Sequence, residues 1–503
     1  MALRLAGDIG CPRKALRILV LFCLSLARIN AANNTAANST YADTIQQTSG
    51  FLQQLADAKL LSGSVAVQKN GQLVYSDGFG WASEELGVPM KDYHIFPIGS
   101  NTKFFTAVCI YQLQEKGLLN VTDAVNLYID PADFDGLGNL GWCPLIYGKE
   151  QLGCQLPTIK QLLEMSSGLL PSDNMGCGTA DSTWTANDWF WQYRLSLNEL
   201  LWGNVSGVTG NLFNGSYTAT QQLNAQKTLF RPMLFAPGEQ YCYTNSNFNL
   251  AAYVVEKLSN MSFTQYVTEN IIKPANLTNT YYWIGGQGME PRGIRKNVVS
   301  IPGYVTTFRG SEGGGAASEY LRVNRGSWWE GDLAYSAAAA GAMFAPIEDL
   351  LKWYNTFTAH PEVVGLSKES LKNLTTPWQS IPVQGHGNVS FGQGIVAAGD
   401  ANMTRRIMYI GGIWGFSTQV QMWLNHADPT KSDAVLFFSN LNPAIPAESK
   451  GVCAVKSPAN DDTVELSASL CGGDPDAGKD ISTYVTDSLA RMWNISQEAS
   501  DTA

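Results

Sequence analysis

The sequence is poor in charged residues and in histidine. Only 15% of its 503 residues are charged, and its four histidines, His94, His360, His386 and His426, are scattered without the spacing of metal ligands. It has no Cys-x-x-Cys pair, so we expect neither a metal site nor a cofactor. Hydrophobic residues make up 45% of the chain, which argues against disorder and favours a globular enzyme.

A long apolar run is also missing at the N-terminus. The run from Ile18 to Ala27 is shorter than the ~20 residues that span a bilayer. It follows a basic start and precedes the small residues Ala31 and Ala32, which is the layout of a secretory signal peptide. We expect residues 1–32 to be removed and 33–43 to form a polar leader. The mature chain is then secreted, or held in the secretory lumen, with no transmembrane segment.

The acidic balance of the chain limits its partners. Removal of residues 1–32 changes the formal net charge from -10 to -14, which disfavours nucleic acid as a partner. Glycosylation sequons, typical of a secreted glycoprotein, occur at Asn33, Asn38, Asn120, Asn204, Asn214, Asn260, Asn276, Asn373, Asn388, Asn402 and Asn494.

The cysteines are compatible with disulfide bonds. Nine are present, and Cys11 and Cys23 leave with the signal peptide. Cys109 lies in an apolar helical stretch, so we expect a free thiol in the core. The other six can form three bridges, and one possible pairing is Cys143 with Cys154, Cys453 with Cys471, and Cys177 with Cys242. The spacing alone leaves this pairing open.

Hydrophobic patterning predicts strands near both ends of the chain and helices between them. A hairpin is predicted around Asn70-Gly71, and late strands over 407–410, 417–423 and 434–439. Helices are predicted over 44–60, 100–116, 158–165, 247–258, 347–357 and 481–493. We therefore expect an α/β fold in which both chain ends build one antiparallel sheet, flanked by helices and joined to a large, mainly helical insertion.

The chemistry is indicated by Ser100-Asn101-Thr102-Lys103, the only Ser-x-x-Lys of the chain. Residues three apart share a helix face, so the Lys103 ammonium group can reach the Ser100 hydroxyl. Serine needs a base to act as a nucleophile, and lysine can serve when burial favours its neutral form. Backbone N–H groups at the start of a helix can also stabilise an oxyanion. Alone, however, the motif is as typical of a serine N-cap beside a solvated lysine.

Further motifs follow in order along the chain. They are Phe96-Pro97-Ile98-Gly99 before the serine, Ser166-Ser167-Gly168-Leu169 after a helix, Phe235-Ala236-Pro237-Gly238 with Tyr243-Thr244-Asn245, Ala340-Gly341-Ala342-Met343, and Gly411-Gly412-Ile413-Trp414-Gly415-Phe416. This set resembles the beta-lactamase-related serine hydrolases, which include class C beta-lactamases, penicillin-binding DD-peptidases and esterases. The resemblance implies a catalytic domain over 44–495, with a helical subdomain over roughly 118–385 and a tail over 496–503.

The resemblance also implies roles for the matching residues. Ser100 is acylated, Lys103 acts as base or electrostatic support, and Tyr243 relays protons. Asn245 holds Lys103 and the substrate, and the backbone N–H of Gly412, with that of Ser100, forms the oxyanion hole. The residue chemistry agrees, because a nearby ammonium group favours the ionised phenol and an asparagine amide both donates and accepts hydrogen bonds.

The third motif departs from the family pattern. Where such proteins place Lys-Thr-Gly or His-x-Gly, this chain has Tyr409-Ile410-Gly411. A tyrosine donates a hydrogen bond but brings no positive charge, so recognition of a substrate carboxylate is in doubt. Simple strand packing is the alternative interpretation of Tyr409.

The middle of the chain is rich in aromatic residues. They either line an apolar cap or pack the core of an added lobe: Trp184, Trp189, Phe190, Trp191, Trp202, Trp328 and Trp329. The sequence thus predicts a serine hydrolase acting on a small-molecule or peptide ester or amide. A silent binding or scaffold protein and an acyl transferase remain alternatives, and the oligomeric state is open.

Overall fold

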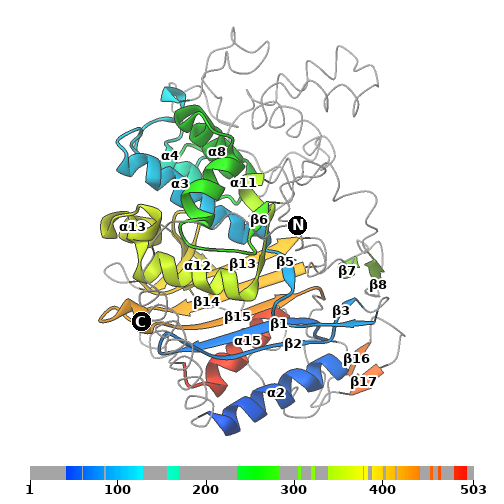
Figure 1. Cartoon of the computed structure of the whole chain (residues 1–503). Coiled ribbons are helices and arrows are strands. Elements are labelled where there is room, and N and C mark those ends of the chain that lie inside the picture. The colour runs from blue at the N-terminus through cyan, green and yellow to red at the C-terminus, as the bar shows by residue number, and fades with distance from the viewer. Residues whose placement is uncertain are drawn as a thin grey trace, which may run out of the picture. The chain divides into compact units, whose positions relative to one another are not determined.

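The computed structural model describes residues 41–58, 60–83, 87–128, 156–168, 235–282, 304–307, 319–322, 338–377, 379–382, 388–399, 404–413, 416–441, 454–456, 463–465 and 481–495. The chain divides into two units, residues 1–51 and 52–503. Within the first, the described residues form the start of helix α2 (Ala42–Asp57). The second unit holds the elements that build the sheet and the candidate site (Figure 1).

An eight-stranded antiparallel sheet is the centre of the second unit. Its spatial order is β10-β11-β12-β13-β14-β15-β1-β2. The strands are β1 (Gly63–Lys69), β2 (Gln72–Phe79), β10 (Gln379–Pro382), β11 (Asn388–Phe391), β12 (Val396–Gly399), β13 (Thr404–Ile413), β14 (Phe416–Trp423) and β15 (Asp433–Ser439). Because β1 pairs with β15, from Gly63 opposite Ser439 to Gln68 opposite Ala434, both ends of the chain join one sheet, as predicted.

The predicted hairpin connects β1 and β2. Asn70 and Gly71 have φ angles of 49° and 74°, which match a type I′ turn. A Cβ at Gly71 would fall 1.8 Å from the Thr430 carbonyl oxygen, so only glycine fits there. The turn fixes the register of the β1–β2 hairpin.

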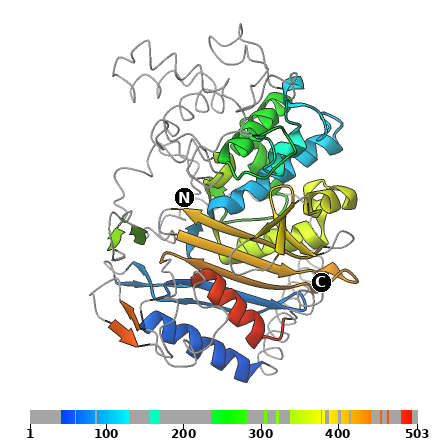
Figure 2. The same cartoon turned by 180° about the vertical axis from the view of Figure 1, so that it is seen from behind.

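The two faces of the sheet are covered by different helices. Strand β14 shows this, because its successive side chains point alternately to the two faces. Gln421 donates a hydrogen bond of 2.9 Å to Thr486 of α15 (Ile481–Met492). The next residue, Met422, contacts Thr358 of α12 (Ile347–Ala359) on the opposite face. Figures 1 and 2 show the same arrangement, with α15 on one side of the strands and α12 on the other. Side chains that alternate along β14 therefore belong to two separate layers.

A helical layer lies beyond α12 and is built around α3 (Thr102–Glu115). Every α3 residue from Thr102 to Leu113 is buried, as expected for a central helix. Its contacts include α8 (Asn245–Ser259), α9 (Phe263–Val267), α11 (Ala338–Gly341) and α13 (Lys368–Thr375). The other elements are α4 (Ile159–Leu163), η1 (Gly99–Asn101), η2 (Val125–Leu127), η4 (Thr268–Ile272), η6 (Pro361–Val364), η7 (Pro429–Lys431), β3 (Trp81–Ser83), β4 (Val88–Pro89), β5 (Ile95–Pro97), β6 (Tyr281–Tyr282), β7 (Tyr304–Thr307), β8 (Glu319–Arg322), β9 (Met343–Pro346), β16 (Ala454–Lys456) and β17 (Thr463–Glu465).

The helical subdomain expected over roughly 118–385 stays a prediction, because much of this span lies outside the described residues. Within the described residues, helix α12 packs on β1 and β15, and β10 belongs to the sheet. Sequence periodicity identifies such a helix but not the face on which it packs.

Several predictions fall outside the described residues. They are the signal peptide, Cys143, Cys154, Cys177, Cys453, Cys471 and the aromatic residues at 184, 189, 190, 191, 202, 328 and 329. Cys109 is described, and it is a free, buried thiol, as expected.

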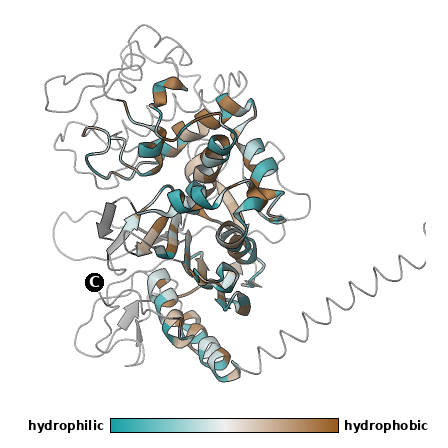
Figure 3. Ribbon diagram, turned by 90° about the vertical axis from the view of Figure 1, so that its left-hand side faces the viewer, coloured by the Kyte–Doolittle hydropathy of each residue, from teal (hydrophilic) through white to brown (hydrophobic). Residues whose placement is uncertain are grey.

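Hydrophobic and hydrophilic residues alternate along the coloured helices of Figure 3. Accordingly, in the described parts of the chain no helix has the length and apolar character needed to cross a membrane.

Candidate functional site

Ser100 lies at the junction between a strand and the central helix. Strand β5 ends at Pro97, and a 3₁₀ turn, η1, carries Ser100 into α3. The prediction placed Ser100 in the first turn of the α-helix, and the structure places it in the 3₁₀ turn just before it. The serine is half-buried and thus still accessible to a substrate.

Lys103 is fully buried, which differs from a solvated lysine beside a helix cap. Its Nζ donates a hydrogen bond of 3.0 Å to Ser100 Oγ and one of 2.8 Å to the carbonyl oxygen of Ala340 in α11. It also lies 4.9 Å from the centre of the Tyr243 ring and 5.8 Å from that of Phe248. The contact that the i, i+3 spacing predicted is therefore present, and these four contacts are with neutral groups.

Tyr243 reaches the same serine from a distant part of the chain. Its hydroxyl donates a hydrogen bond of 2.7 Å to Ser100 Oγ. The segment before α8 is held by the turn after α4, where the Met165 carbonyl accepts a 2.8 Å hydrogen bond from the Cys242 N–H. In the same way, the Ser166 carbonyl accepts one of 2.8 Å from the Gly238 N–H. The Ser-Ser-Gly turn thus positions the tyrosine.

Two glycines of β13 lie against the turn that carries Ser100. A Cβ at Gly99 would fall 3.1 Å from the Gly412 nitrogen, so the Gly412 backbone is directly adjacent to η1. Gly411 is buried and Gly412 is exposed. This brings the two predicted oxyanion-hole donors, the N–H groups of Ser100 and Gly412, to neighbouring places on the site.

Tyr409 points to the same face of the sheet, because it and Gly411 are two residues apart on β13. Its side chain is 3% exposed, and its ring packs edge-on against Phe391, 6.3 Å away. Phe391 also packs edge-on against Tyr243 at 6.4 Å. Burial raises the pKa of Tyr409 well above its ordinary value, and the nearby Tyr243 phenol raises it further. Among the described residues, the Tyr409 hydroxyl has no hydrogen-bond partner of good geometry, and burial keeps its phenol neutral.

Asn245 is the first residue of α8, two positions after Tyr243, and is half-buried. Its expected role in holding Lys103 and the substrate stays a prediction.

Sequence reasoning missed three groups that support the site. Ala340 lay within a recognised motif, but nothing indicated that its carbonyl oxygen binds Lys103. Asn101 and Thr418, which share a hydrogen bond of 3.0 Å beside Ser100, were also missed. Asn101 is the second residue of the Ser-x-x-Lys motif, so its type was visible, whereas its partner on β14 was not.

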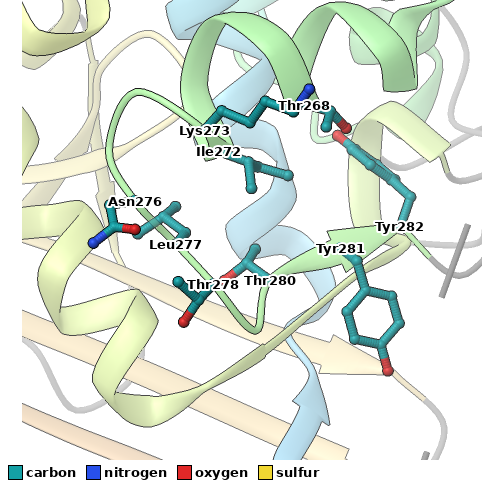
Figure 4. Close-up of a pocket in the computed structure, with 9 residues that line it drawn as sticks. All are labelled: Thr268, Ile272, Lys273, Asn276, Leu277, Thr278, Thr280, Tyr281 and Tyr282. Atoms are coloured by element: carbon teal, nitrogen blue, oxygen red, sulfur yellow. The ribbon is translucent and has the colours of Figure 1, made fainter. Parts of the chain in front are cut away.

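The described residues contain no cluster of three or more histidine, cysteine or acidic side chains that could hold a metal ion. A separate hollow of about 520 Å³ lies between η4 and β6, and it contains none of the site residues (Figure 4).

Comparison with known proteins gives a family assignment. The family model described as Beta-lactamase matches residues 48–450. Protein flp of Staphylococcus aureus (strain NCTC 8325 / PS 47) is 25% identical over 241 residues, which cover 48% of this chain and 39% of that protein. Penicillin-binding protein 4* of Bacillus subtilis (strain 168) is 22% identical over 376 residues, or 75% of this chain and 68% of the relative. The chain thus spans only about two fifths of Protein flp.

Solved structures show the same fold. The octameric penicillin-binding protein homologue from Pyrococcus abyssi aligns with a TM-score of 0.53 at 20% identity, covering 79% of this chain and 73% of that chain. The D-stereospecific amidohydrolase from Streptomyces sp. aligns with a TM-score of 0.51 at 23% identity, covering 80% and 94%. With a family model matched over most of its length, the chain belongs to the beta-lactamase family of serine hydrolases.

Proposed function

We propose that this chain is a secreted serine hydrolase that forms an acyl-enzyme at Ser100 with an ester or amide substrate that carries no carboxylate. One observation carries the proposal: the Ser100 hydroxyl oxygen is hydrogen-bonded both to Lys103 Nζ, at 3.0 Å, and to the Tyr243 hydroxyl, at 2.7 Å. A nucleophile with two proton-transfer groups at hydrogen-bond distance is the arrangement that acyl transfer requires.

In the acylation step, Ser100 Oγ attacks the carbonyl carbon of the substrate. The Lys103–Tyr243 pair takes up the proton of the hydroxyl as the new C–O bond forms. The N–H groups of Ser100 and Gly412 stabilise the negative charge on the carbonyl oxygen. The tetrahedral intermediate then collapses, the bond to the leaving group breaks, and the pair returns the proton to that group.

In the deacylation step, a water molecule takes the place of the leaving group. The pair removes one proton from water as its oxygen attacks the acyl carbon, and the ester bond to Ser100 breaks. The proton passes to Ser100 Oγ, which restores the hydroxyl and releases the acid. The same two side chains therefore serve both steps.

The preference for a substrate without a carboxylate is inferred from Tyr409. The Tyr409 phenol lies beside Tyr243, at the position on β13 where related proteins usually carry the lysine of Lys-Thr-Gly or the histidine of His-x-Gly. Since burial keeps the phenol protonated, it offers no positive charge to a substrate carboxylate. Neutral esters and amides are then better substrates than penicillin-like lactams or peptides with a free carboxyl end.

Secretion is supported by the sequence and by one cysteine. The N-terminal segment has the layout of a signal peptide, and Cys242 is disulfide-bonded in the structure. Its partner lies outside the described residues, because Cys109, the other described cysteine, is free. Disulfide bonds persist mainly in oxidising compartments.

A fluorophosphonate probe tests the function directly, because it phosphonylates an activated serine. We expect the purified glycosylated protein to be labelled at Ser100 and Ser100→Ala to be unlabelled. Ser367→Ala is a matched control, since Ser367 caps α13 away from the site and its loss leaves labelling unchanged. A folded wild-type protein that resists the probe contradicts the proposal and favours a binding protein.

Product analysis separates hydrolysis from acyl transfer. The solved structure of EstCE1, described as a hydrolase with promiscuous acyltransferase activity, aligns with a TM-score of 0.53 at 17% identity, covering 81% of this chain and 95% of that chain. We expect the free acid as the main product from a panel of esters, lactams and D-amino-acid peptides. A new ester as main product when an alcohol is added identifies a transferase instead.

A further inference from the structure

The two N–H groups of the proposed oxyanion hole come from distant parts of the sequence. Ser100 belongs to η1, and Gly412 belongs to β13. Both must point at one oxygen atom, and a shift on the order of 1 Å in such a site can reduce the rate about 10²-fold. The structure must therefore contain groups that fix the distance between η1 and β13.

Thr418 lies at this junction. It faces Gly411 across the β13–β14 pair and is fully buried. Its hydroxyl donates a hydrogen bond of 3.0 Å to the Ile98 carbonyl oxygen, with the Gly411 carbonyl oxygen as a longer alternative at 3.3 Å. It also accepts a hydrogen bond of 3.0 Å from the Asn101 side-chain amide. The Thr418 hydroxyl thus links Ile98 and Asn101, which lie on either side of Ser100, to strand β14. At this point β14 pairs with Gly411 of β13.

Asn101 completes the link. Its amide nitrogen also donates to the Ile98 carbonyl oxygen at 3.2 Å, and its amide oxygen accepts a 3.2 Å hydrogen bond from the Tyr354 hydroxyl of α12. Asn101 is 1% exposed. The turn is therefore attached to both the sheet and the helix above it by buried hydrogen bonds, which are costly to leave unmade.

Glycine makes this close approach possible. A Cβ at Gly411 would fall 2.1 Å from the Ile98 carbonyl oxygen, 2.5 Å from Thr418 Oγ1 and 2.9 Å from the Asn101 amide nitrogen. The backbone of β13 therefore sits directly against the hydrogen-bonded group, and any movement of Thr418 or Asn101 is passed to Gly411 and Gly412.

We propose that Thr418 and Asn101 are positioning residues that set the separation of the Ser100 and Gly412 backbone nitrogens. They act through the backbone of η1 and β13. The expected effect on catalysis rests on the proposed function, whereas the expected effect on the separation of the two nitrogens does not.

Two substitutions at one position test the proposal. Thr418→Val keeps the shape of the side chain and removes the hydroxyl, whereas Thr418→Ser keeps the hydroxyl. With a p-nitrophenyl ester we expect Thr418→Val to lower kcat by about 10- to 100-fold, with KM nearly unchanged, because the loss falls on the transition state. Affinity for an arylboronic acid, whose adduct places an oxygen in the oxyanion hole, falls by the same factor. The pH profile stays the same, and Thr418→Ser retains most of the activity.

A matched control is Thr486→Val, which removes another buried threonine hydroxyl on the opposite face of the sheet. It leaves kcat and boronate affinity at the wild-type level. The proposal is overturned if Thr418→Val keeps wild-type kcat, if Thr418→Ser is equally impaired, or if Thr486→Val loses as much activity.

Crystal structures give a test that does not depend on turnover. The separation of the Ser100 and Gly412 nitrogens is compared between the wild type and Thr418→Val, and an unchanged separation refutes the positioning role. An inactive wild type refutes the hydrolase, while this comparison still decides whether Thr418 holds the two nitrogens in place.

Discussion

The hydroxyl of Tyr243 lies 2.7 Å from Ser100 Oγ, although 143 positions separate the two residues in the sequence. Their approach depends on the turn after α4, which holds the Tyr243 segment by backbone hydrogen bonds. The distance is short enough for direct proton transfer, so the phenol is the group whose removal tests the relay most directly.

Tyr243→Phe is expected to lower kcat by about 10²- to 10⁴-fold, the usual contribution of a general acid–base group. The ring remains, so its packing on Phe391 and beside Lys103 is retained, and the melting temperature changes little. Tyr241→Phe is the control, since Tyr241 also packs against Phe391, whereas the described hydrogen bonds to Ser100 Oγ come from Lys103 and Tyr243. Steady-state kinetics of both variants give the answer, and equal losses in the two variants argue against a relay.

Lys103→Met tests the second proton-transfer group. Methionine fills much of the volume of the lysine but cannot take up or donate a proton. We expect turnover to fall by about 10²- to 10⁴-fold. The free energy of unfolding falls by ~1–3 kcal/mol, because the Ala340 carbonyl oxygen loses its hydrogen bond from Lys103. Lys116→Met, at the exposed end of the same helix, keeps full activity. A Lys103→Met protein that still hydrolyses esters at the wild-type rate rules out the lysine as base.

The sequence predicted the parts of the fold that depend on local patterns. The turn at Asn70-Gly71 needs positive φ angles, which these two residue types supply. The expected alternation is not seen in β1, whose residues from Gly63 to Gln68 are all buried. Helix periodicity placed Ser100 and Lys103 on one face, although the spacing alone is as typical of a serine N-cap beside a solvated lysine. Because strands at both ends must cover apolar faces, their union in one sheet was also predictable.

Other features arise only when distant segments meet. The face on which α12 packs, the carbonyl of Ala340 at Lys103 and the hydroxyl of Thr418 at Asn101 all depend on tertiary contacts that no spacing along the chain encodes. Tyr409 is an intermediate case: its type showed that a positive charge is missing, while its burial against Phe391 came from the structure.

Tyr409→Phe tests whether this phenol is simply packed. Among the described residues its buried hydroxyl has no hydrogen bond of good geometry. Its removal therefore leaves none of these residues without a partner, and it removes a polar group that burial has taken out of water. We expect the free energy of unfolding to stay equal or rise by ~1 kcal/mol, with neutral-ester hydrolysis within a few-fold of wild type. Tyr111→Phe is the matched control, because the buried Tyr111 hydroxyl donates a 2.8 Å hydrogen bond to Gln393. That variant is destabilised by ~1–3 kcal/mol. Urea unfolding compares the two, and a large loss in Tyr409→Phe means that its hydroxyl has a partner in solution.

Glu164 gives the stability of the protein a dependence on pH. It ends α4 next to the turn that holds the Tyr243 segment, and burial raises its pKa from 4.5 to about 7 although Lys160 opposes the shift. Between these two values the folded protein binds a proton that the unfolded chain has released. The free energy of unfolding therefore falls as the pH rises through this window and is level above it.

Glu164→Gln removes this contribution, because the amide stays neutral at every pH. A shift of this size corresponds to roughly 3 kcal/mol between pH 4.5 and pH 8, to which the similarly shifted Glu256 adds its own part. Urea unfolding at both pH values measures the difference, and it should shrink in Glu164→Gln but not in Glu269→Gln, whose carboxylate is exposed and bonded to Lys273. An undiminished pH dependence in Glu164→Gln shows that the carboxyl is solvated in the native protein. In that case the turn beneath Tyr243 is more open in solution than its packing here indicates.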